Sequence, residues 1–244
     1  MQNYFREVIN YLQLLEHQQC EQLNKATTMT TKTLKNNGLI YVFGCGHSHI
    51  FSEELFYRAG GLANIVPILY EPLMLHQGAM QASVNEKKNN FIQNFMLNYP
   101  ITKQDLVIVI STSGINPVSI DVANYSKEQG AQVITISSHI YQNLEKSRHS
   151  TGQYLGQCGH LNIDNLVPHG DTVCQSLAFK HTPISTVLGI SILQTIISQA
   201  IEQTKFPDIF MSGNITGSQE HNINLVKKYQ KQIPMLTNNL ELKL

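Results

Sequence analysis

The stretch LIYVFGCGHS, residues 39–48, decides how the rest of the chain is interpreted. Five strand-forming residues end in Gly44-Cys45-Gly46, and the polar Ser48 then begins a helical pattern. A strand, a tight turn and a helix N-terminus form, in that order, an arrangement that receives phosphate groups. Glycines let an anion approach the main chain closely, and the N–H groups of the turn point outward. We therefore expect Gly46 and Ser48 to bind an anion.

A second turn of the same kind follows the apolar run at residues 106–110. That run, LVIVI, is apolar at every residue, which indicates a strand buried on both faces of a parallel sheet. Asn116 and Pro117 then supply an N-cap candidate and a proline at the first helical position. We expect this turn and the first one to form a single anion pocket, to which the second turn contributes Ser111, Thr112, Ser113 and Asn116.

Strands alternate with helices along the chain, which predicts an α/β fold with a doubly wound, five-stranded parallel sheet flanked by helices. The strand order 2-1-3-4-5 makes the first and third strands neighbours at the switch point where such sheets bind ligands. Pro67 makes the second strand an edge strand. Strands are expected at 39–43, 64–70, 106–110, 132–137 and 161–166, and helices at about 49–60, 90–98, 117–129, 182–203 and 219–232.

The whole chain is interpreted as a single domain. A helical extension at residues 1–36 precedes an α/β core at 37–205, and a loop and helix at 206–244 follow it. The helix from Thr182 to Gln203 is apolar over most of its circumference. A helix that lies on one side of a sheet needs a narrower apolar face, so we expect a homodimer or a higher homo-oligomer. Burial on several sides within one subunit is the alternative.

Composition narrows the classes of function. The 244 residues have a formal net charge of zero, and no basic footprint of a nucleic-acid binder is present. The four cysteines form no CxxC pair and no signal peptide is recognised, which predicts reduced thiols in the cytoplasm. No apolar run reaches the roughly 18 residues that a membrane helix needs, so no membrane partner is expected.

The two hydroxyl-rich turns resemble those of the SIS (sugar isomerase) domain family over about residues 35–205. The resemblance implies a phosphosugar-binding fold related to phosphoheptose isomerase and to N-acetylmuramic acid 6-phosphate etherase. The segments around 53–61, 213–214 and 221–222 look like an uncharacterised bacterial subfamily of about this length. The resemblance implies that hydroxyls of Ser48, Ser111 and Ser113 bind the phosphate, with Thr112 contributing a hydroxyl or its amide. Asn116 either bonds the phosphate or caps the helix that begins at Pro117.

The resemblance also suggests where to look for catalytic groups. Phosphoheptose isomerase has a glutamate on the helix after the first turn, but its position falls on Arg58 here. Glu54 lies one helical turn earlier on the same face, so Glu54 and Arg58 form either a catalytic pair or a surface salt bridge. By position, Glu71 resembles an acid–base carboxylate of the etherases. His221 resembles the late histidine that often comes from a neighbouring subunit in related enzymes.

These residues favour a protein that binds a phosphorylated sugar and acts on it as an aldose–ketose isomerase. A phosphosugar etherase or lyase and a non-catalytic phosphosugar sensor are the alternatives. A dinucleotide-binding domain is disfavoured because its third glycine falls on His49. No Gly-x-Ser-x-Gly elbow of a serine hydrolase is present. His47 and His49 alone are a weak zinc signal, so no metal or cofactor is expected.

Overall fold

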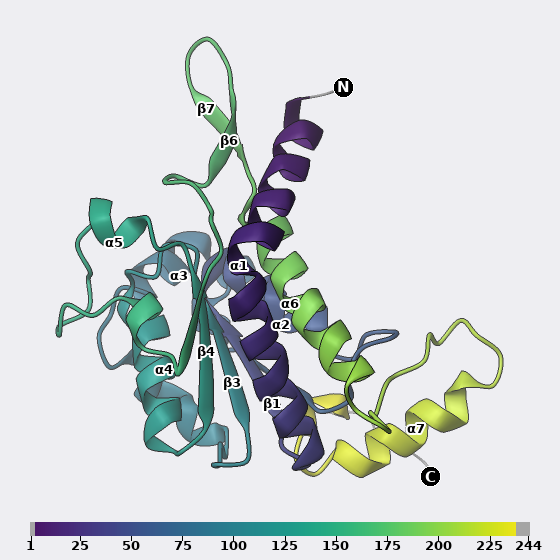
Figure 1. Cartoon of the computed structure of the whole chain (residues 1–244). Helices are drawn as coiled ribbons and strands as arrows, with labels where there is room; N and C mark the ends of the chain where they lie inside the picture. Colours follow the sequence, from purple (N-terminus) through teal and green to yellow (C-terminus); the bar gives the residue numbers. More distant parts are fainter. Residues whose placement is uncertain (1–2, 238–244) are drawn as a thin grey trace.

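The computed structural model describes residues 3–237 of the chain, in which helices and strands alternate (Figure 1). The strands are β1 Ile40–Gly44, β2 Ile65–Ile68, β3 Leu106–Ile110, β4 Gln132–Ser137, β5 Leu161–Asp164, β6 Thr172–Gln175 and β7 Lys180–Pro183. The helices are α1 Asn3–Lys35, α2 Ile50–Leu55, α3 Ala79–Asn85, α4 Pro117–Glu128, α5 Tyr141–Leu144, α6 Ser185–Glu202 and α7 Ser218–Tyr229. The last seven residues of the predicted C-terminal extension lie outside the described residues, and the predicted domain bounds stay a prediction.

Five strands form one parallel sheet in the order β2-β1-β3-β4-β5, which confirms the predicted fold class and strand order. The register pairs Gly44, the last residue of β1, with Ile110, the last residue of β3. The two turns that follow these strands therefore start side by side at one edge of the sheet. Pro67 lies in the edge strand β2, as predicted. The outer side of an edge strand has no neighbouring strand, so the missing amide donor of a proline costs no hydrogen bond there.

Helices cover both faces of the sheet (Figure 1). Along β1, Ile40 and Val42 point to the face covered by α1, α2 and α6, whereas Tyr41 and Phe43 point to the face covered by α4 and α7. This alternation follows from the two-residue period of a strand. Burial of such apolar side chains, about 1.5–3 kcal/mol each, is the main force that holds the layers together.

The apolar circumference of α6 is buried within the chain itself. Leu188, Ile192, Leu193 and Ile196 are fully buried in the core that α6 forms with the sheet and α1. α1 and α6 run side by side, and Thr27 of α1 donates to Gln199 of α6 at 2.9 Å. The composition of α6 is thus explained by packing inside one subunit, and the predicted homodimer needs other support.

Two predicted helices differ from the observed ones. The helix predicted at 49–60 ends at Leu55, because Tyr57 takes a positive φ and packs against Phe210 at 4.8 Å between ring centroids. The segment predicted as a helix at 90–98 forms two 3₁₀ turns, Phe91–Asn94 and Met96–Asn98. Between them Phe95 is extended in φ and its ring stacks on Phe43 and Tyr70, so aromatic packing overrides the helical pattern.

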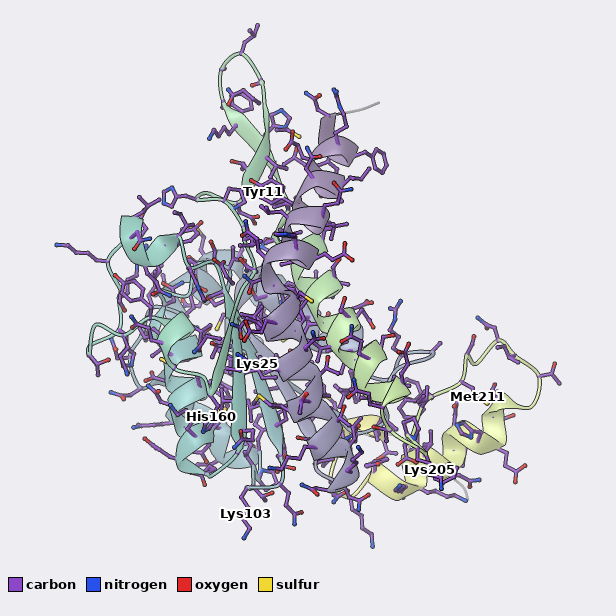
Figure 2. The ribbon with its side chains drawn as sticks, in the orientation of Figure 1. Tyr11, Lys25, Lys103, His160, Lys205 and Met211 are labelled. Carbon is purple, nitrogen blue, oxygen red and sulfur yellow. The ribbon has the colours of Figure 1, made fainter. Side chains whose placement is uncertain are left out.

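An antiparallel hairpin, β6–β7, was not predicted and projects from the body beside the N-terminal part of α1 (Figure 1). The Tyr4 hydroxyl of α1 donates to the Pro183 carbonyl at the base of the hairpin, at 3.2 Å. Tyr11, labelled in Figure 2, lies partly buried on the same helix. Because residues 182–183 belong to β7, α6 begins at Ser185 rather than at Thr182. None of the helices within residues 3–237 is long and apolar enough to cross a membrane.

Candidate functional site

A cavity of about 570 Å³ lies at the carboxyl ends of β1 and β3, the predicted switch point of the sheet. Both hydroxyl-rich turns line it, together with the base of the hairpin and the end of α3. All six residues predicted to bind the ligand contribute to its walls: Gly46, Ser48, Ser111, Thr112, Ser113 and Asn116. The structure thus brings the two separate motifs together in one cavity.

The first turn depends on two glycines. A Cβ atom added at Gly44 would lie 2.3 Å from the carbonyl oxygen of Ser48, so the chain can turn this tightly only at a glycine. Gly46 has φ +56°, in the left-handed region that favours glycine. The Ser48 amide closes the turn by donating to the Cys45 carbonyl at 2.9 Å. Ser48 is 9% exposed and is held in the cavity wall.

The second turn uses only one of its hydroxyls internally, and that one as an acceptor. The Ser111 Oγ accepts the Gly114 amide at 3.2 Å, which leaves its hydroxyl proton available for donation. The main chain of the turn is anchored to β4, because Ser111 donates to Ile136 and Thr112 accepts from Ser138. Among the described residues, no hydrogen bond involves the hydroxyls of Ser48, Thr112 or Ser113. These groups can therefore bind a ligand at no cost to the fold.

Asn116 occupies the N-cap position of α4, but its side chain does not cap the helix. Its Oδ1 instead accepts from Arg148 Nη1 at 2.7 Å. Because a guanidinium can only donate, this bond assigns the oxygen of the Asn116 amide to Arg148 and leaves the NH₂ group for another acceptor. Of the two roles predicted for Asn116, capping by its side chain is wrong and phosphate binding stays a prediction, while the structure adds a link to the loop that carries Arg148.

Glu86 is an ionisable cavity residue that the sequence did not reveal. It follows α3 directly, lines the cavity and is half-buried. Burial raises its pKa above the ordinary value, while the charge of Lys87, a hydrogen bond from Asn116 and the charge of Arg148 act in the opposite direction. A carboxyl group with a raised pKa in a cavity is suited to proton transfer near neutral pH. Its position in a polar stretch of sequence gave no signal of this role.

Asp171, at the rim, has a structural role that its surroundings explain. Its Oδ1 accepts the amides of Ile184 and Ser185 at 3.1 and 2.9 Å, and its Oδ2 accepts the Ser185 hydroxyl at 2.6 Å. These bonds cap the N-terminus of α6 from a distant part of the chain, where a negative charge is favoured by the helix dipole. Asp171 also lines the cavity.

The three residues predicted as catalytic do not line this cavity. Glu54, half-buried near the end of α2, pairs at 2.8 Å with the exposed Arg58 beyond that helix, the salt bridge that the sequence offered as an alternative. Glu71 is exposed in the 3₁₀ turn after β2. The His221 Nε2 bonds to the Ile209 carbonyl at 2.8 Å. Their catalytic roles stay predictions, and within one subunit Glu86 is better placed.

The arrangement has no feature of a preformed metal site in the part of the chain that the structure describes. Over residues 3–237, no three His, Cys, Asp or Glu side chains gather closely enough to hold a metal ion. His47 lines the cavity, whereas the His49 Nδ1 bonds to the Gly46 carbonyl. The pair of histidines that bracket Ser48 is therefore divided between the cavity and the turn.

The fold and the paired turns define an SIS-type protein, and sequence comparison agrees. The chain belongs to the SIS domain family, whose model matches residues 3–138. The match includes α1, whereas the resemblance inferred from the two turns began at about residue 35. It ends at Ser138, the residue after β4.

More closely, the chain is similar over its whole length to bacterial UPF0309 proteins. UPF0309 protein lin2794 of Listeria innocua is 46% identical, and the alignment covers 98% of this chain and 99% of the relative. UPF0309 protein GK1441 of Geobacillus kaustophilus is 42% identical, with 98% of both chains covered. Among solved structures, phosphoheptose isomerase GmhA from Neisseria gonorrhoeae is 16% identical, with a TM-score of 0.49 over 82% of this chain and 94% of that chain.

Proposed function

We propose that the protein binds a phosphorylated sugar in the cavity between Ser48 and Ser111–Ser113 and interconverts its aldose and ketose forms. The observation that carries this proposal is the convergence of free hydroxyls from two turns on the same cavity as the half-buried Glu86. A site for a phosphate and a site for proton transfer then lie within reach of one small sugar. Membership of the SIS family supports the assignment of the ligand class.

The phosphate is held by dipoles rather than by a lysine. Hydroxyls of Ser48, Ser111 and Ser113 donate to its oxygens, and the N-terminus of α4 adds a partial positive charge beside them. Hydrogen bonds to a charged group are worth about 1.5–3 kcal/mol each. The phosphate thus anchors one end of the sugar and leaves the carbonyl end free for chemistry.

Glu86 performs the proton transfer. Its ionised carboxylate removes the proton from the carbon next to the sugar carbonyl, and the electron pair of that C–H bond forms the C=C bond of an enediol as the carbonyl oxygen takes a proton from water. The same carboxyl group then returns its proton to the former carbonyl carbon, while the other hydroxyl gives its proton to the hydroxide left in the first step and becomes the new carbonyl. A raised pKa brings the acid and base forms of Glu86 closer to balance at neutral pH. His47, which also lines the cavity, offers an imidazole for opening the sugar ring.

The experiment is to incubate the protein with a panel of hexose, heptose and amino-sugar phosphates in D₂O and to follow each by NMR. An isomerase exchanges deuterium into the carbon next to the carbonyl and produces the isomer. Loss of a lactyl or other ether substituent identifies the etherase or lyase reaction instead. Binding without any change in the spectrum identifies a sensor. If no sugar phosphate binds, the proposal is wrong.

We also propose that the protein acts in the cytoplasm as a homodimer. Exposed apolar side chains on the projecting hairpin and on α1 support an intersubunit contact: Leu177 and Phe179 on the hairpin, and Phe5 and Ile9 on α1. Such side chains gathered on projecting elements mark interaction surfaces. His221 is exposed and does not line the Ser48 cavity of its own subunit. In a dimer, it would instead contribute to the Ser48 cavity of the other subunit. Light scattering should give twice the chain mass at micromolar concentration, and a monodisperse monomer contradicts the proposal.

A further inference from the structure

A buried histidine–aspartate pair lies outside the Ser48 cavity and takes no part in the chemistry proposed above. The His149 Nε2 bonds to Asp121 Oδ1 at 2.9 Å, and its Nδ1 bonds to the Thr151 hydroxyl at 2.7 Å. The side chains of His149 and Asp121 are 6% and 12% exposed, and neither lines the cavity. Because both ring nitrogens are engaged, the imidazole is fixed in one orientation.

Asp121 connects α4 to two segments that are far apart in the sequence, residues 86–90 and residues 148–150. Its Oδ1 pairs with His149, and its Oδ2 accepts the Asn90 amide at 2.8 Å. Hydrogen bonds to a carboxylate are shorter and stronger than those between neutral groups. One largely buried side chain thereby holds both segments against the same helix.

Two further bonds tighten this arrangement. The Ser150 amide donates to Asn89 Oδ1 at 2.8 Å, which joins the two segments directly. The Val118 amide of α4 donates to the Glu86 carbonyl at 3.4 Å, so the start of the earlier segment is also tied to the helix. The two segments and α4 therefore form one hydrogen-bonded unit.

These segments carry two charges on which the candidate site depends. Glu86 lines the Ser48 cavity, and Arg148 immediately precedes His149. The Arg148 guanidinium donates to Asn116 in the cavity wall at 2.7 Å, and its charge opposes the rise that burial causes in the pKa of Glu86. Coulomb interactions weaken with distance. The effect of Arg148 on Glu86 therefore depends on how firmly the two segments are held together.

We propose that the Asp121–His149 pair is a positioning device for the candidate site, which holds the segment of Glu86 and the segment of Arg148 in one fixed arrangement. Neither member of the pair is a catalytic residue, because neither lines the cavity that receives the substrate. The proposal rests on the role given to Glu86 in the proposed function, but its test observes the Glu86 carboxyl group directly and needs no sugar phosphate. Failure of isomerase activity and failure of the positioning role are therefore distinguishable.

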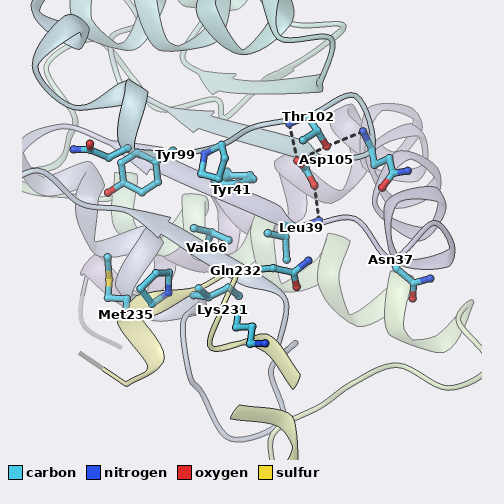
Figure 3. Close-up of a pocket in the computed structure, with 15 residues that line it drawn as sticks. Asn37, Leu39, Tyr41, Val66, Tyr99, Thr102, Asp105, Lys231, Gln232 and Met235 are labelled. Carbon is cyan, nitrogen blue, oxygen red and sulfur yellow. Dashed lines mark hydrogen bonds between the residues drawn. The ribbon is translucent and has the colours of Figure 1, made fainter. Parts of the chain in front are cut away.

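Asp105 supplies a structural comparison, because it is a buried carboxylate that joins segments away from the site (Figure 3). Its Oδ1 accepts the Leu39 amide at 2.8 Å, and its Oδ2 accepts the Thr102 amide and hydroxyl at 2.7 and 2.8 Å. It lines a cavity of about 610 Å³ at the amino ends of β1 and β3, the opposite edge of the sheet from the Ser48 cavity. Thr102→Val removes one of these bonds and is the matched structural control.

The test measures the pKa of Glu86 by ¹³C NMR on the full-length protein labelled at its glutamate carboxyl groups, with Glu86→Gln used to assign the signal. His149→Phe keeps a ring but removes the bond to Asp121. The hold on Arg148 then loosens, and the pKa of Glu86 should rise by about 0.3–1 unit. His149→Gln is equally uncharged but keeps an N–H donor for Asp121, so its Glu86 should titrate close to the wild-type pKa. The two variants separate the bond from any charge on the ring.

Amide hydrogen exchange on the same proteins tests the link between the segments. His149→Phe should speed exchange in residues 86–90 as well as in its own loop, because both segments are held by Asp121. Thr102→Val should lower the stability of the protein without this local change. A coupling between two segments that a single histidine joins is the result that the proposal predicts.

A second variant keeps the proposal testable if His149→Phe does not fold. Asn89→Ala removes the bond to Ser150 at an exposed position. It should raise the pKa of Glu86 by less than His149→Phe does. The proposal is overturned if neither variant raises this pKa, if His149→Gln raises it as far as His149→Phe does, or if Thr102→Val raises it equally.

Discussion

Arg148 Nη1 donates to Asn116 Oδ1 across 2.7 Å, and this bond determines which way the Asn116 amide faces. The NH₂ group remains as a donor. The Asn116 side chain and the charge of Arg148 both lower the pKa of Glu86, against the larger effect of burial. Arg148 is itself fixed, because its main-chain amide donates to the Ile115 carbonyl at 2.9 Å. A residue on an exposed loop thereby orients the polar groups of the cavity.

Replacing Arg148 with methionine should therefore raise the pKa of Glu86 further. The lost positive charge no longer favours the ionised carboxylate, and the Asn116 amide is free to rotate. Since Glu86 acts first as a base, the acidic limb of the profile of kcat/KM against pH should move to higher pH, so that activity on that limb falls by less than about 10-fold. Arg148→Lys keeps the positive charge but loses the planar guanidinium, so its pH profile should lie between those of the wild type and Arg148→Met. Superimposable profiles for the wild type and Arg148→Met would argue against this linkage.

Glu86→Gln should abolish most turnover while leaving binding intact. Removing a general base costs about 10²- to 10⁴-fold in rate, whereas the phosphate is held by residues on other elements. We expect kcat to fall by that factor and the Kd of the sugar phosphate to change less than about threefold. Glu128→Gln, at the exposed C-terminal end of α4, is a matched control that should retain full activity. A greater loss in Glu54→Gln than in Glu86→Gln would return the catalytic role to Glu54.

The raised pKa of Glu86 also predicts how stability depends on pH. The folded protein holds this proton more tightly than the unfolded chain does, so the contribution of Glu86 to stability is fully present below the unfolded pKa and is lost as pH rises through the folded pKa. Glu86→Gln does not ionise and escapes this loss. Chemical denaturation should show the variant more stable than the wild type at pH 8, with this difference shrinking as the pH falls through the folded pKa of Glu86 and absent below about pH 4.5. A difference that is constant with pH would contradict the assignment.

Asp171→Ala should destabilise the fold through α6. It removes the acceptor of two amides and one hydroxyl at the first turn of that helix, together with a favourable charge at its N-terminus. The expected loss is about 1–2 kcal/mol of unfolding free energy, measured by urea denaturation. Asp171→Asn keeps an acceptor oxygen and should lose less. If both variants are as stable as the wild type, the capping role is wrong.

The sequence allowed the sheet to be predicted because its signals are local. LVIVI at residues 106–110 and the Gly-x-Gly turn after residue 43 each report a strand and its end, and the rules for parallel connections then give the strand order. The same two turns predicted the cavity walls, since neighbouring parallel strands bring their carboxyl ends together. Ser111 is the residue after β3, and Ser48 lies in the 3₁₀ turn Gly46–His49 that follows β1, so both could be placed without knowing the course of the longer loops.

What could not be predicted depends on long-range packing. Glu86 reaches the cavity through the path of residues 71–85, a series of short turns and α3 whose course the sequence does not specify. The hairpin β6–β7 carries few apolar residues in alternation, so its strands have no pattern to detect. The link from Arg148 to Asn116 joins side chains 32 residues apart. Catalytic predictions made by position along the chain, for Glu54, Glu71 and His221, could not anticipate any of these.

The central claim, that the paired turns hold a phosphate, is tested most directly by isothermal titration of a sugar phosphate and its unphosphorylated sugar into the wild type and into Ser111→Ala and Ser113→Ala. Each lost hydroxyl should weaken binding of the phosphate by about 1–3 kcal/mol, and the unphosphorylated sugar should bind weakly to all three proteins. Equal affinity of the wild type for the two ligands, or unchanged phosphate affinity in both serine variants, would contradict the account.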